Sequence, residues 1–411
     1  MVQKNFNVII VNKTEKVKEN KCIVRVMDGH LDEFKKAMLE IDPECMKDFK
    51  DLKYESPPEY TFKDWWDLPV FDPVCPDYKW GMCDVYVKDK KTISSIQNMV
   101  NTQAKSFWYP FYPNFHEGNK VWTTTEKHIP RYPVYVISLG RWKKHQRLTS
   151  NSLEEIGVPY HLVVEEQEKQ NYIDNGVKED VLLTLPKELC QLGQGSVPVR
   201  NWVWNHSMEN GHKRHWVLDD NINGFYRLHQ CRRWKVMSGL PLCMVEDVVD
   251  RYKDIYLSGL NYKFFAPNTD VRRQRVQMNT RIYSGILIQN DCPIRWRGRY
   301  NEDTDLSLRV MKAGHTTLLF NNFLIDKKAT NTCKGGNTSS IYSEENGMLK
   351  KAESLQEQHP DVAKVTDKKF VGKKEYHHIV NYKQYKHNGL VCINEPKNKT
   401  INNYGLTLID V

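Results

Sequence analysis

The sequence has 411 residues, of which 40% are hydrophobic and 11% aromatic, and its 60 basic and 51 acidic residues give a net charge of +9. This composition excludes a mostly disordered chain, and no apolar run reaches the length of a membrane span. The N-terminus also lacks the charged, apolar and small-residue order of a signal peptide. We therefore expect a soluble intracellular protein with no membrane partner, built from two domains or from one domain with an appendage.

Residues 1–125 predict a small α+β accessory module. Two β-rich runs, residues 22–26 and 84–87, are each followed by a helical pattern, over residues 31–39 and 92–100. Two aromatic segments with prolines, residues 57–69 and 106–113, accompany them. Aromatic side chains of this kind either stack on nucleic-acid bases or pack a loop onto the core, and both interpretations stay open here.

Residues 126–365 alternate between strand and helix patterns, which predicts an α/β domain with a mostly parallel sheet. The helices are expected after Ser150, from Pro198 onward and around Val245 to Tyr252. The strands are expected at residues 134–138, 160–165, 216–218, 255–257 and 281–289. Residues 366–411 are polar and rich in lysine, which predicts a C-terminal lid or tail. The ten cysteines include no Cys-x-x-Cys pair, so reduced thiols are expected rather than a zinc ribbon or a disulfide framework.

Two acidic clusters lie about eighty residues apart. The first follows an apolar strand pattern and reads Trp216-Val217-Leu218-Asp219-Asp220-Asn221. Because such a strand ends at the crevice where ligands bind, these acids are placed for a divalent metal and a diphosphate. The alternative is a turn in which the aspartates cap backbone amides.

The second cluster opens a predicted helix with Glu302 and Asp303. A carboxylate there lies at the positive end of the helix dipole and could accept the proton of an attacking hydroxyl. The alternative is an acidic first turn that only caps the helix.

Loops and basic residues add further candidates. The segment 191–201 contains glycines and leads through Arg200 into a helix, so its backbone amides could bind phosphate. Lys334-Gly335-Gly336-Asn337 is a similar flexible segment, and an ordinary turn is the alternative for both. His359 precedes Pro360, where it either completes a metal site or ends a helix facing solvent.

An arginine-rich region extends from Val271 to Arg299 and contains one acid, Asp291. This density predicts binding of a polyanion, with solvated surface arginines as the alternative. Its seven arginines are Arg272, Arg273, Arg275, Arg281, Arg295, Arg297 and Arg299.

Taken in order, these motifs resemble the TET-associated glycosyltransferases of bacteriophages over residues 131–386. The motifs that carry the resemblance are Arg131-Tyr132-Pro133-Val134-Tyr135-Val136-Ile137-Ser138, Leu192-Gly193-Gln194-Gly195, Trp216-Val217-Leu218-Asp219-Asp220-Asn221, the segment 295–309 and Lys334-Gly335-Gly336-Asn337-Thr338. Residues 64–66 and 105–110 are also similar to a phage module that accompanies such enzymes.

The resemblance implies a GT-A-like fold and an inverting, metal-dependent transfer. A sugar, arabinose or glucose, would move from a UDP-sugar to the hydroxymethyl group of 5-hydroxymethylcytosine in phage DNA, in the cytoplasm of the infected host. The same fold acting on a protein or glycan, and an inactive DNA-binding accessory protein, are the alternatives. The oligomeric state and the need for base flipping stay open.

The resemblance also implies roles for individual residues. Asp303 would be the catalytic base and Glu302 would position the acceptor. The usual Asp-x-Asp is Asp-Asp-Asn here, so Asp220 is the expected ligand of Mn²⁺ or Mg²⁺, with His359 as a further candidate. The expected donor-binding residues are Ser138, Glu165, Arg200, Asn201, Asp219, Asn221, Gly335 and Gly336. The expected DNA-binding residues are Arg272, Arg273, Arg275, Arg295, Arg297 and Arg299.

Overall fold

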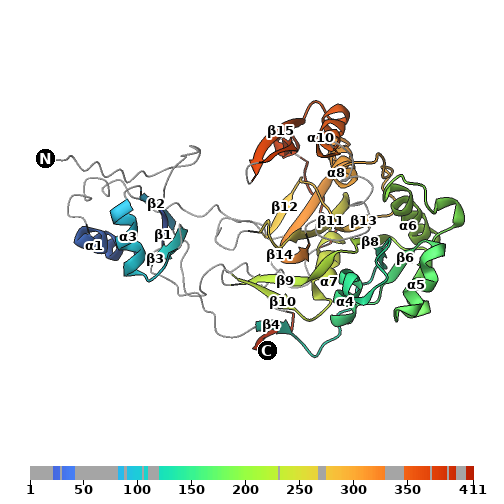
Figure 1. The fold of residues 1–411 in the computed structure, drawn as a ribbon, viewed down its shortest axis with the longest axis horizontal. Coiled ribbons are helices and arrows are strands. Elements are labelled where there is room, and N and C mark those ends of the chain that lie inside the picture. Colours follow the sequence, from blue (N-terminus) through green and yellow to red (C-terminus); the bar gives the residue numbers. More distant parts are fainter. Residues whose placement is uncertain are drawn as a thin grey trace. The chain divides into compact units, whose positions relative to one another are not determined.

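The computed structural model places its described residues in two compact units, the first within residues 22–109 and the second from Lys120 onward (Figure 1). The residues described are 22–27, 30–41, 82–87, 90–103, 106–109, 120–229, 232–266, 275–328, 347–370, 373–386, 388–394 and 404–411. Within them, no helix combines the length and apolar character needed to cross a membrane. The aromatic segment 57–69 and the Gly335-Gly336 pair lie outside the described residues.

The first unit is a three-stranded sheet with two helices. Strand β1 (Cys22–Met27) pairs antiparallel with β2 (Met82–Val87) and parallel with β3 (Ser106–Tyr109), and the helices are α1 (Leu31–Ile41) and α3 (Lys90–Met99). The predicted strand and helix runs of this region are therefore confirmed.

The core of the first unit explains its local structure. In α1, Leu31, Phe34 and Met38 share one face because they are three and four residues apart, and all three are buried. Phe107 and Tyr109 of β3 join the same core, and the Tyr109 ring lies 5.1 Å from the Phe34 ring. For these two aromatic residues, packing onto the core is the observed outcome.

The second unit is built on a large mixed sheet, in the order β17-β4-β10-β9-β14-β11-β13-β8-β5-β6-β7, with β12 beside β14. Its strands are β4 (Lys120–Thr123), β5 (Val134–Ile137), β6 (His161–Val164), β7 (Leu182–Thr184), β8 (Arg214–Asp219), β9 (Ile222–His229), β10 (Arg232–Val236), β11 (Ile255–Tyr262), β12 (Val276–Met278), β13 (Gly285–Gln289), β14 (Thr316–Lys327) and β17 (Thr407–Asp410). The predicted α/β class is confirmed. The expected parallel pairing holds across β7, β6, β5 and β8, while β13 pairs antiparallel with β8.

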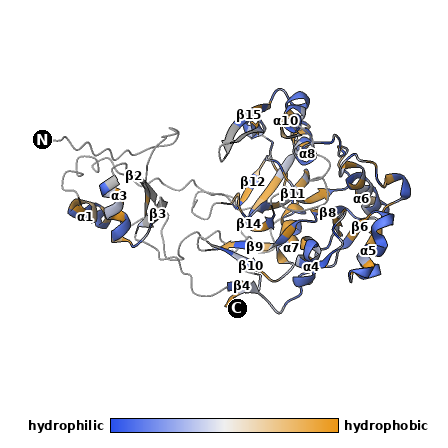
Figure 2. Ribbon diagram, viewed as in Figure 1, coloured by the Kyte–Doolittle hydropathy of each residue, from blue (hydrophilic) through white to orange (hydrophobic). Residues whose placement is uncertain are grey.

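Helices cover both faces of this sheet. They are α4 (Leu148–Glu155), α5 (Lys169–Asp174), α6 (Val197–Glu209), α7 (Leu240–Val249) and α8 (Glu302–Lys312), and a further helix, α10 (Gly347–Gln358), packs beside α8. Short 3-10 turns occupy Lys144–Gln146, Glu166–Glu168, Glu179–Val181, Lys187–Leu189 and Tyr382–Tyr385. The strands β15 (Ala363–Phe370) and β16 (Lys373–Val380) form a separate hairpin next to α10. Figure 2 shows apolar residues gathered in the strands of the sheet and hydrophilic ones along α5.

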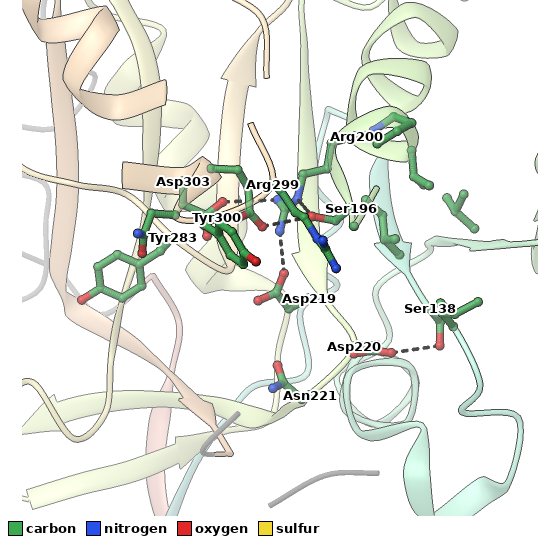
Figure 3. Close-up of a pocket in the computed structure, with 18 of the residues that line it drawn as sticks. Ser138, Ser196, Arg200, Asp219, Asp220, Asn221, Tyr283, Arg299, Tyr300 and Asp303 are labelled. Carbon is green, nitrogen blue, oxygen red and sulfur yellow. Dashed lines mark hydrogen bonds and ion pairs between the residues drawn. The ribbon is translucent and has the colours of Figure 1, made fainter. Parts of the chain in front are cut away.

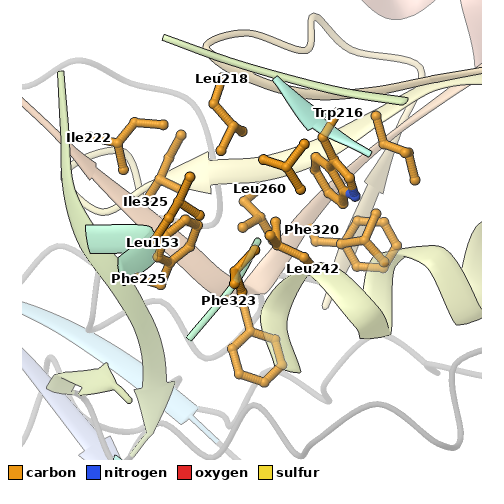
Figure 4. Close-up of a cluster of buried hydrophobic side chains, with 14 of the residues drawn as sticks. Leu153, Trp216, Leu218, Ile222, Phe225, Leu242, Leu260, Phe320, Phe323 and Ile325 are labelled. Atoms are coloured by element: carbon orange, nitrogen blue, oxygen red, sulfur yellow. The ribbon is translucent and has the colours of Figure 1, made fainter. Parts of the chain in front are cut away.

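The alternation of side chains along β8 produces two separate cores. Trp216 and Leu218 point to one face, where Leu153 of α4 and Leu242 of α7 pack against them (Figure 4). Val217 points to the other face, toward residues of α6 and α8. Because successive strand residues face opposite sides, one apolar strand anchors helices on both faces of the sheet.

The same strand arrangement determines where polar residues gather. The parallel strands β5, β6 and β8 end in register, with Ile137 level with both Val163 and Asp219. Ser138 and Glu165 directly follow β5 and β6. All three strands therefore present their carboxyl ends at one edge of the sheet, which in open α/β sheets is where ligands bind.

A close backbone approach between β11 and β13 gives a test of this packing. A Cβ atom at Gly259 would lie 2.3 Å from the Gly285 carbonyl oxygen and 2.7 Å from Ile282 Cγ2. We expect Gly259→Ala to lower the free energy of unfolding by about 1–3 kcal/mol or more, because the strands must separate to admit the methyl group. Urea denaturation followed by circular dichroism measures this loss.

Gly389→Ala is the matched control, because a Cβ there meets no atom within 4 Å. That variant should stay within about 0.5 kcal/mol of the wild type. Equal stability of the Gly259 and Gly389 variants would show that the strands are not tightly held.

Candidate active site

A pocket with a volume of about 960 Å³ opens at the carboxyl ends of the parallel strands. Its lining comes from the segments after β5, β6 and β8, from the start of α6, from the start of α8 and from the end of β14. Figure 3 shows that Asp219 lies between Asp303 on one side and Asp220 with Ser138 on the other. The two predicted acidic clusters therefore meet in one pocket.

Asp219 is held by two cations. Its Oδ1 accepts a hydrogen bond from Arg200 Nη2 at 2.8 Å, and its Oδ2 accepts one from Lys327 Nζ at 2.7 Å. Ser284 Oγ also donates to Oδ2, at 2.7 Å. Burial alone would raise the pKa of Asp219, but Lys327 and Arg200 hold it well below its usual range. Asp219 is therefore a fixed anion that orients both cations.

Asp220 has a different environment. It forms an ion pair with Arg141 and accepts a hydrogen bond from Ser138 Oγ at 3.1 Å. Burial raises the pKa of Asp220 to about 6, although Arg141 acts in the opposite direction. The ionised form of such a buried carboxylate is stabilised when a further cation binds near it.

Arg200 connects the two acidic clusters. Its guanidinium is almost completely buried, and its Nη1 lies 3.6 Å from Asp303 Oδ1 while its Nη2 binds Asp219. Its Nε donates to Ser196 Oγ at 3.1 Å, and Ser196 Oγ in turn donates to Glu302 at 3.0 Å. The guanidinium also stacks over the Trp296 ring, 4.6 Å from the ring centroid.

Asp303 has the properties of a proton acceptor. Burial and the neighbouring Glu302 charge raise its pKa to about 7, against the lowering effect of Arg200. Its Oδ1 is buried and accepts no hydrogen bond within the described structure, while the side chain as a whole is 19% exposed. A carboxylate with a pKa near neutrality that is partly exposed in the lining of the pocket suits general base catalysis.

The local fold places Asp303 at the helix start. Asn301 precedes α8 in the left-handed region, with φ of 54°, and its Nδ2 donates to the Lys351 carbonyl oxygen at 2.6 Å. Asparagine tolerates this conformation better than most residues. Glu302 and Asp303 therefore occupy the first turn, as the sequence predicted.

The predicted donor-binding residues divide into two groups. Ser138, Glu165 and Asn221 line the pocket, and Glu165 Oε1 accepts a hydrogen bond from the Gln191 amide at 2.9 Å. Asn201 is not in the pocket lining, because its side-chain amide binds the Trp296 backbone, with distances of 3.0 and 3.1 Å. Asn201 therefore holds Trp296 beneath Arg200 rather than facing a ligand.

The predicted DNA-binding arginines that the structure describes lie in different environments. Arg299 is exposed and lines the pocket. Arg295 stacks over the Trp204 ring at 4.3 Å and donates to the Cys292 carbonyl oxygen, and Arg297 forms an ion pair with Asp305. Arg275 is partly buried, and Arg272 and Arg273 lie outside the described residues.

Sequence patterns did not predict several residues that bind the aspartates of the pocket. Arg141, Lys327 and Ser284 contact the aspartates directly, yet they come from three separate segments of the chain. The backbone pairing of β13 with β8 brings Ser284 next to Asp219, whose amide donates to the Ser284 carbonyl oxygen at 2.8 Å. Their positions at strand ends were the available signal. Arg141 comes shortly after β5, and Lys327 is the last residue of β14.

A divalent cation fits this donor set if the ligand supplies most of its oxygens. Among the described residues, no group of three His, Cys, Asp or Glu side chains could hold a metal. Asn221 Oδ1, however, is buried without a hydrogen-bond partner, next in sequence to Asp220. Mg²⁺ and Mn²⁺ need few protein ligands when phosphate and water oxygens complete the octahedron. Asp220 and Asn221 are thus the residues that would hold a metal.

A model of the TET-associated glycosyltransferases matches residues 132–336. The chain belongs to this family. The match includes every described residue discussed above from Ser138 to Lys327, so the pocket lies within the family's own region. A comparison with curated proteins gives no match. Membership of the TET-associated glycosyltransferase family confirms, at that level, the prediction of a sugar-transferring enzyme.

His359 lies outside the region that matches the TET-associated glycosyltransferases, and its position corrects one expectation. It is buried, and its Nε2 lies 2.9 Å from Asp305 Oδ1 rather than in the lining of the pocket with Asp220. Arg297 and Arg309 bind the same carboxylate, at 3.0 and 2.8 Å. His359 therefore contacts Asp305 of α8, and it lies outside the pocket lining that contains Asp220.

The Asp305 cluster gives a stability prediction. Although burial opposes it, the contacts with His359, Arg297 and Arg309 lower the pKa of Asp305 to about 2, from an unfolded value of about 4. The cluster therefore stabilises the fold above about pH 4, and this stability is lost as the pH falls toward 2. We expect Asp305→Asn to lower the free energy of unfolding by about 3–5 kcal/mol at neutral pH.

Asp361→Asn is the matched control, because Asp361 pairs with Lys312 on the surface and its side chain is 48% exposed. It should cost less than about 1 kcal/mol. Denaturation at neutral pH and at about pH 3 measures both variants. If Asp305→Asn were as mild as Asp361→Asn, the cluster would not anchor α8.

Proposed function

We propose that this protein is an inverting glycosyltransferase that acts on DNA. It transfers arabinose or glucose from a UDP-sugar to the hydroxymethyl group of 5-hydroxymethylcytosine, in the cytoplasm of a phage-infected bacterium. The observation that carries the proposal is the buried Asp303 carboxylate with its raised pKa, joined through Arg200 to the Asp219-Asp220-Asn221 strand end. Membership of the TET-associated glycosyltransferases supports the reaction class.

The donor half of the pocket is assigned to the side of Ser138 and Glu165. These residues follow β5 and β6, and in a GT-A-like fold this edge receives the nucleoside. The loop that ends at Ser196 leads into α6, so its amides are available to phosphate oxygens. Arg141, Arg200 and Lys327 supply positive charge near Asp219 and Asp220, where the diphosphate would lie.

The proposed reaction is a single displacement. The acceptor hydroxyl gives its proton to Asp303 and its oxygen forms a bond to the anomeric carbon, while the bond from that carbon to the diphosphate oxygen breaks. Configuration at the carbon inverts. Arg200 and Lys327 stabilise the negative charge that develops on the departing diphosphate, and Glu302 orients the acceptor. Mn²⁺ or Mg²⁺, held by Asp220 and Asn221, would add Lewis-acid stabilisation of the same charge.

The proposal is tested by mass spectrometry of nucleosides. DNA containing 5-hydroxymethylcytosine is incubated with the protein, Mn²⁺ and a panel of UDP-sugars, and unmodified DNA is the control. We expect a mass gain of one pentose or one hexose on the hydroxymethylated base alone, and its loss when the metal is chelated.

Two results would contradict the proposal. Transfer to a protein or glycan but not to DNA would assign the same pocket a different acceptor. Folded protein that binds DNA and neither transfers nor hydrolyses any donor would indicate an accessory protein without catalysis.

The metal is tested separately. Undiminished transfer after chelation would remove the metal from the proposal and leave the proposed acceptor unchanged.

The raised pKa of Asp303 predicts how the rate of transfer depends on pH. Because the base must be ionised and its pKa is raised to about 7, kcat/KM should increase as the pH rises through that value. Asp303→Asn should lower kcat by about 10²–10⁴-fold with little change in donor affinity. Asp220→Asn is the comparison, since it should lower activity yet retain the pH-dependent limb near 7. A flat profile for the wild type, or near-normal turnover of Asp303→Asn, would exclude Asp303 as the base.

A further inference from the structure

An aromatic cluster borders the pocket and has no role in the mechanism above. It consists of Tyr262, Phe264, Phe265 and Tyr283, which come from the end of β11 and from the segment before β13. Phe265 is 40% exposed and Phe264 is 57% exposed. Phe265 lines the pocket, and Phe264 lies next to it, so together they offer an exposed apolar surface that a ligand can cover.

The rings are held in defined orientations. Phe265 stacks on Tyr262 with centroids 5.5 Å apart and an interplanar angle of 21°, and it meets the Tyr283 ring edge-on at 6.1 Å. Tyr262 is fixed by a hydrogen bond to Ser284, which also binds Asp219. Phe265 is therefore presented by a buried support rather than by a free loop tip.

A cation accompanies the rings. The Arg281 guanidinium lies 4.7 Å from the Tyr283 centroid and 5.8 Å from the Phe265 centroid. Arg281, Phe265 and Tyr283 all line the pocket, together with Arg299 and Lys351. Stacking surfaces next to positive charge are the combination that binds single nucleotides through base and phosphate.

The cluster lies on the acceptor side. In Figure 3, Tyr283 lies beyond Asp303, whereas Ser138 and Asp220 lie on the opposite side of Asp219. Tyr262 also adjoins the centre of the pocket, because the Lys327 ammonium that binds Asp219 is 5.5 Å from its ring. A group that stacks on Phe265 would thus reach Asp303 from the side opposite the proposed nucleoside.

Asp303 is too enclosed to meet a base within a duplex. Its side chain is 19% exposed, and it lies inside the pocket beside the buried Arg200. General base catalysis requires the acceptor hydroxyl within hydrogen-bond distance of the carboxylate. A stacked base cannot enter a pocket without leaving its neighbours, whereas an extruded base can.

We propose that Phe265, Tyr283 and Arg281 form a subsite for an acceptor nucleobase that has left the base stack. The base stacks on the Phe265 ring, and Arg281 binds its phosphate or its polar edge. This inference rests on the proposed transfer to DNA and adds the form in which the acceptor enters.

The test combines steady-state kinetics with a fluorescence measurement of base extrusion. Phe265→Ala should raise KM for a 5-hydroxymethylcytosine oligonucleotide roughly ten-fold or more, while the rate of UDP-sugar hydrolysis without acceptor stays unchanged. Arg281→Ala should raise the same KM and weaken its dependence on salt. Phe265→Trp, which keeps an aromatic face, should restore binding.

A duplex with 2-aminopurine next to the modified base reports extrusion directly. Asp303→Asn protein should raise its fluorescence on binding, and the Asp303→Asn/Phe265→Ala protein should not. Ile409→Ala is the matched control, because Ile409 is 43% exposed on the edge strand β17 and does not line the pocket. It should leave both readouts unchanged.

The outcomes separate the subsite from the function. Transfer by the wild type with an unchanged KM in Phe265→Ala, or transfer to duplex without any fluorescence rise, would overturn the subsite and leave the proposed function standing. A loss of donor hydrolysis in Phe265→Ala would place the cluster on the donor side and also overturn the subsite. Absence of transfer to any hydroxymethylated DNA would overturn both.

Discussion

The rest of the site depends on the ion pairs that the Arg200 guanidinium forms with Asp219 and Asp303. The guanidinium is buried between Asp219 and Asp303, and it is supported from behind by the Trp296 ring. Two carboxylates this close repel each other unless a cation lies between them, and a buried charge without a partner is strongly unfavourable. The strand end of β8 and the start of α8 can therefore approach each other only because α6 places Arg200 between them.

The same ion pairs give the two acids different properties. Asp219 has two cations and a hydroxyl on its oxygens, so it remains ionised, while Asp303 has one more distant cation and a neighbouring glutamate, so its pKa rises. Environments that separate the pKa values of nearby carboxylates are how active sites assign different roles to the same side chain. On this basis Asp219 organises the site and Asp303 can exchange a proton.

Sequence patterns predicted the parts of the site that are local. The apolar run that ends in Asp219 and Asp220, and the acidic first turn with Glu302 and Asp303, each occupy the expected element. Lys327 could not be predicted as a partner of Asp219, because their contact arises only when β14 and β8 take their places in the sheet. For the same reason the sequence indicates His359 as a metal ligand and Asn201 as a donor-binding residue. In the structure His359 contacts Asp305, and Asn201 binds the Trp296 backbone. Periodicity reports burial and element type, and it carries no information on such long-range partners.

The placement of Asp303 and Asp305 on one turn of α8 has a consequence for how the enzyme can change. Asp305 attaches this turn to Arg309 of the same helix and to His359 beyond α10, so Asp303 cannot shift without disturbing a buried ion cluster. Phe264 and Phe265, in contrast, follow the end of β11 in a short turn and are exposed. Substitutions there leave the ion cluster intact, so the rim of the pocket can change in shape and chemistry while the position of the Asp303 carboxylate is retained.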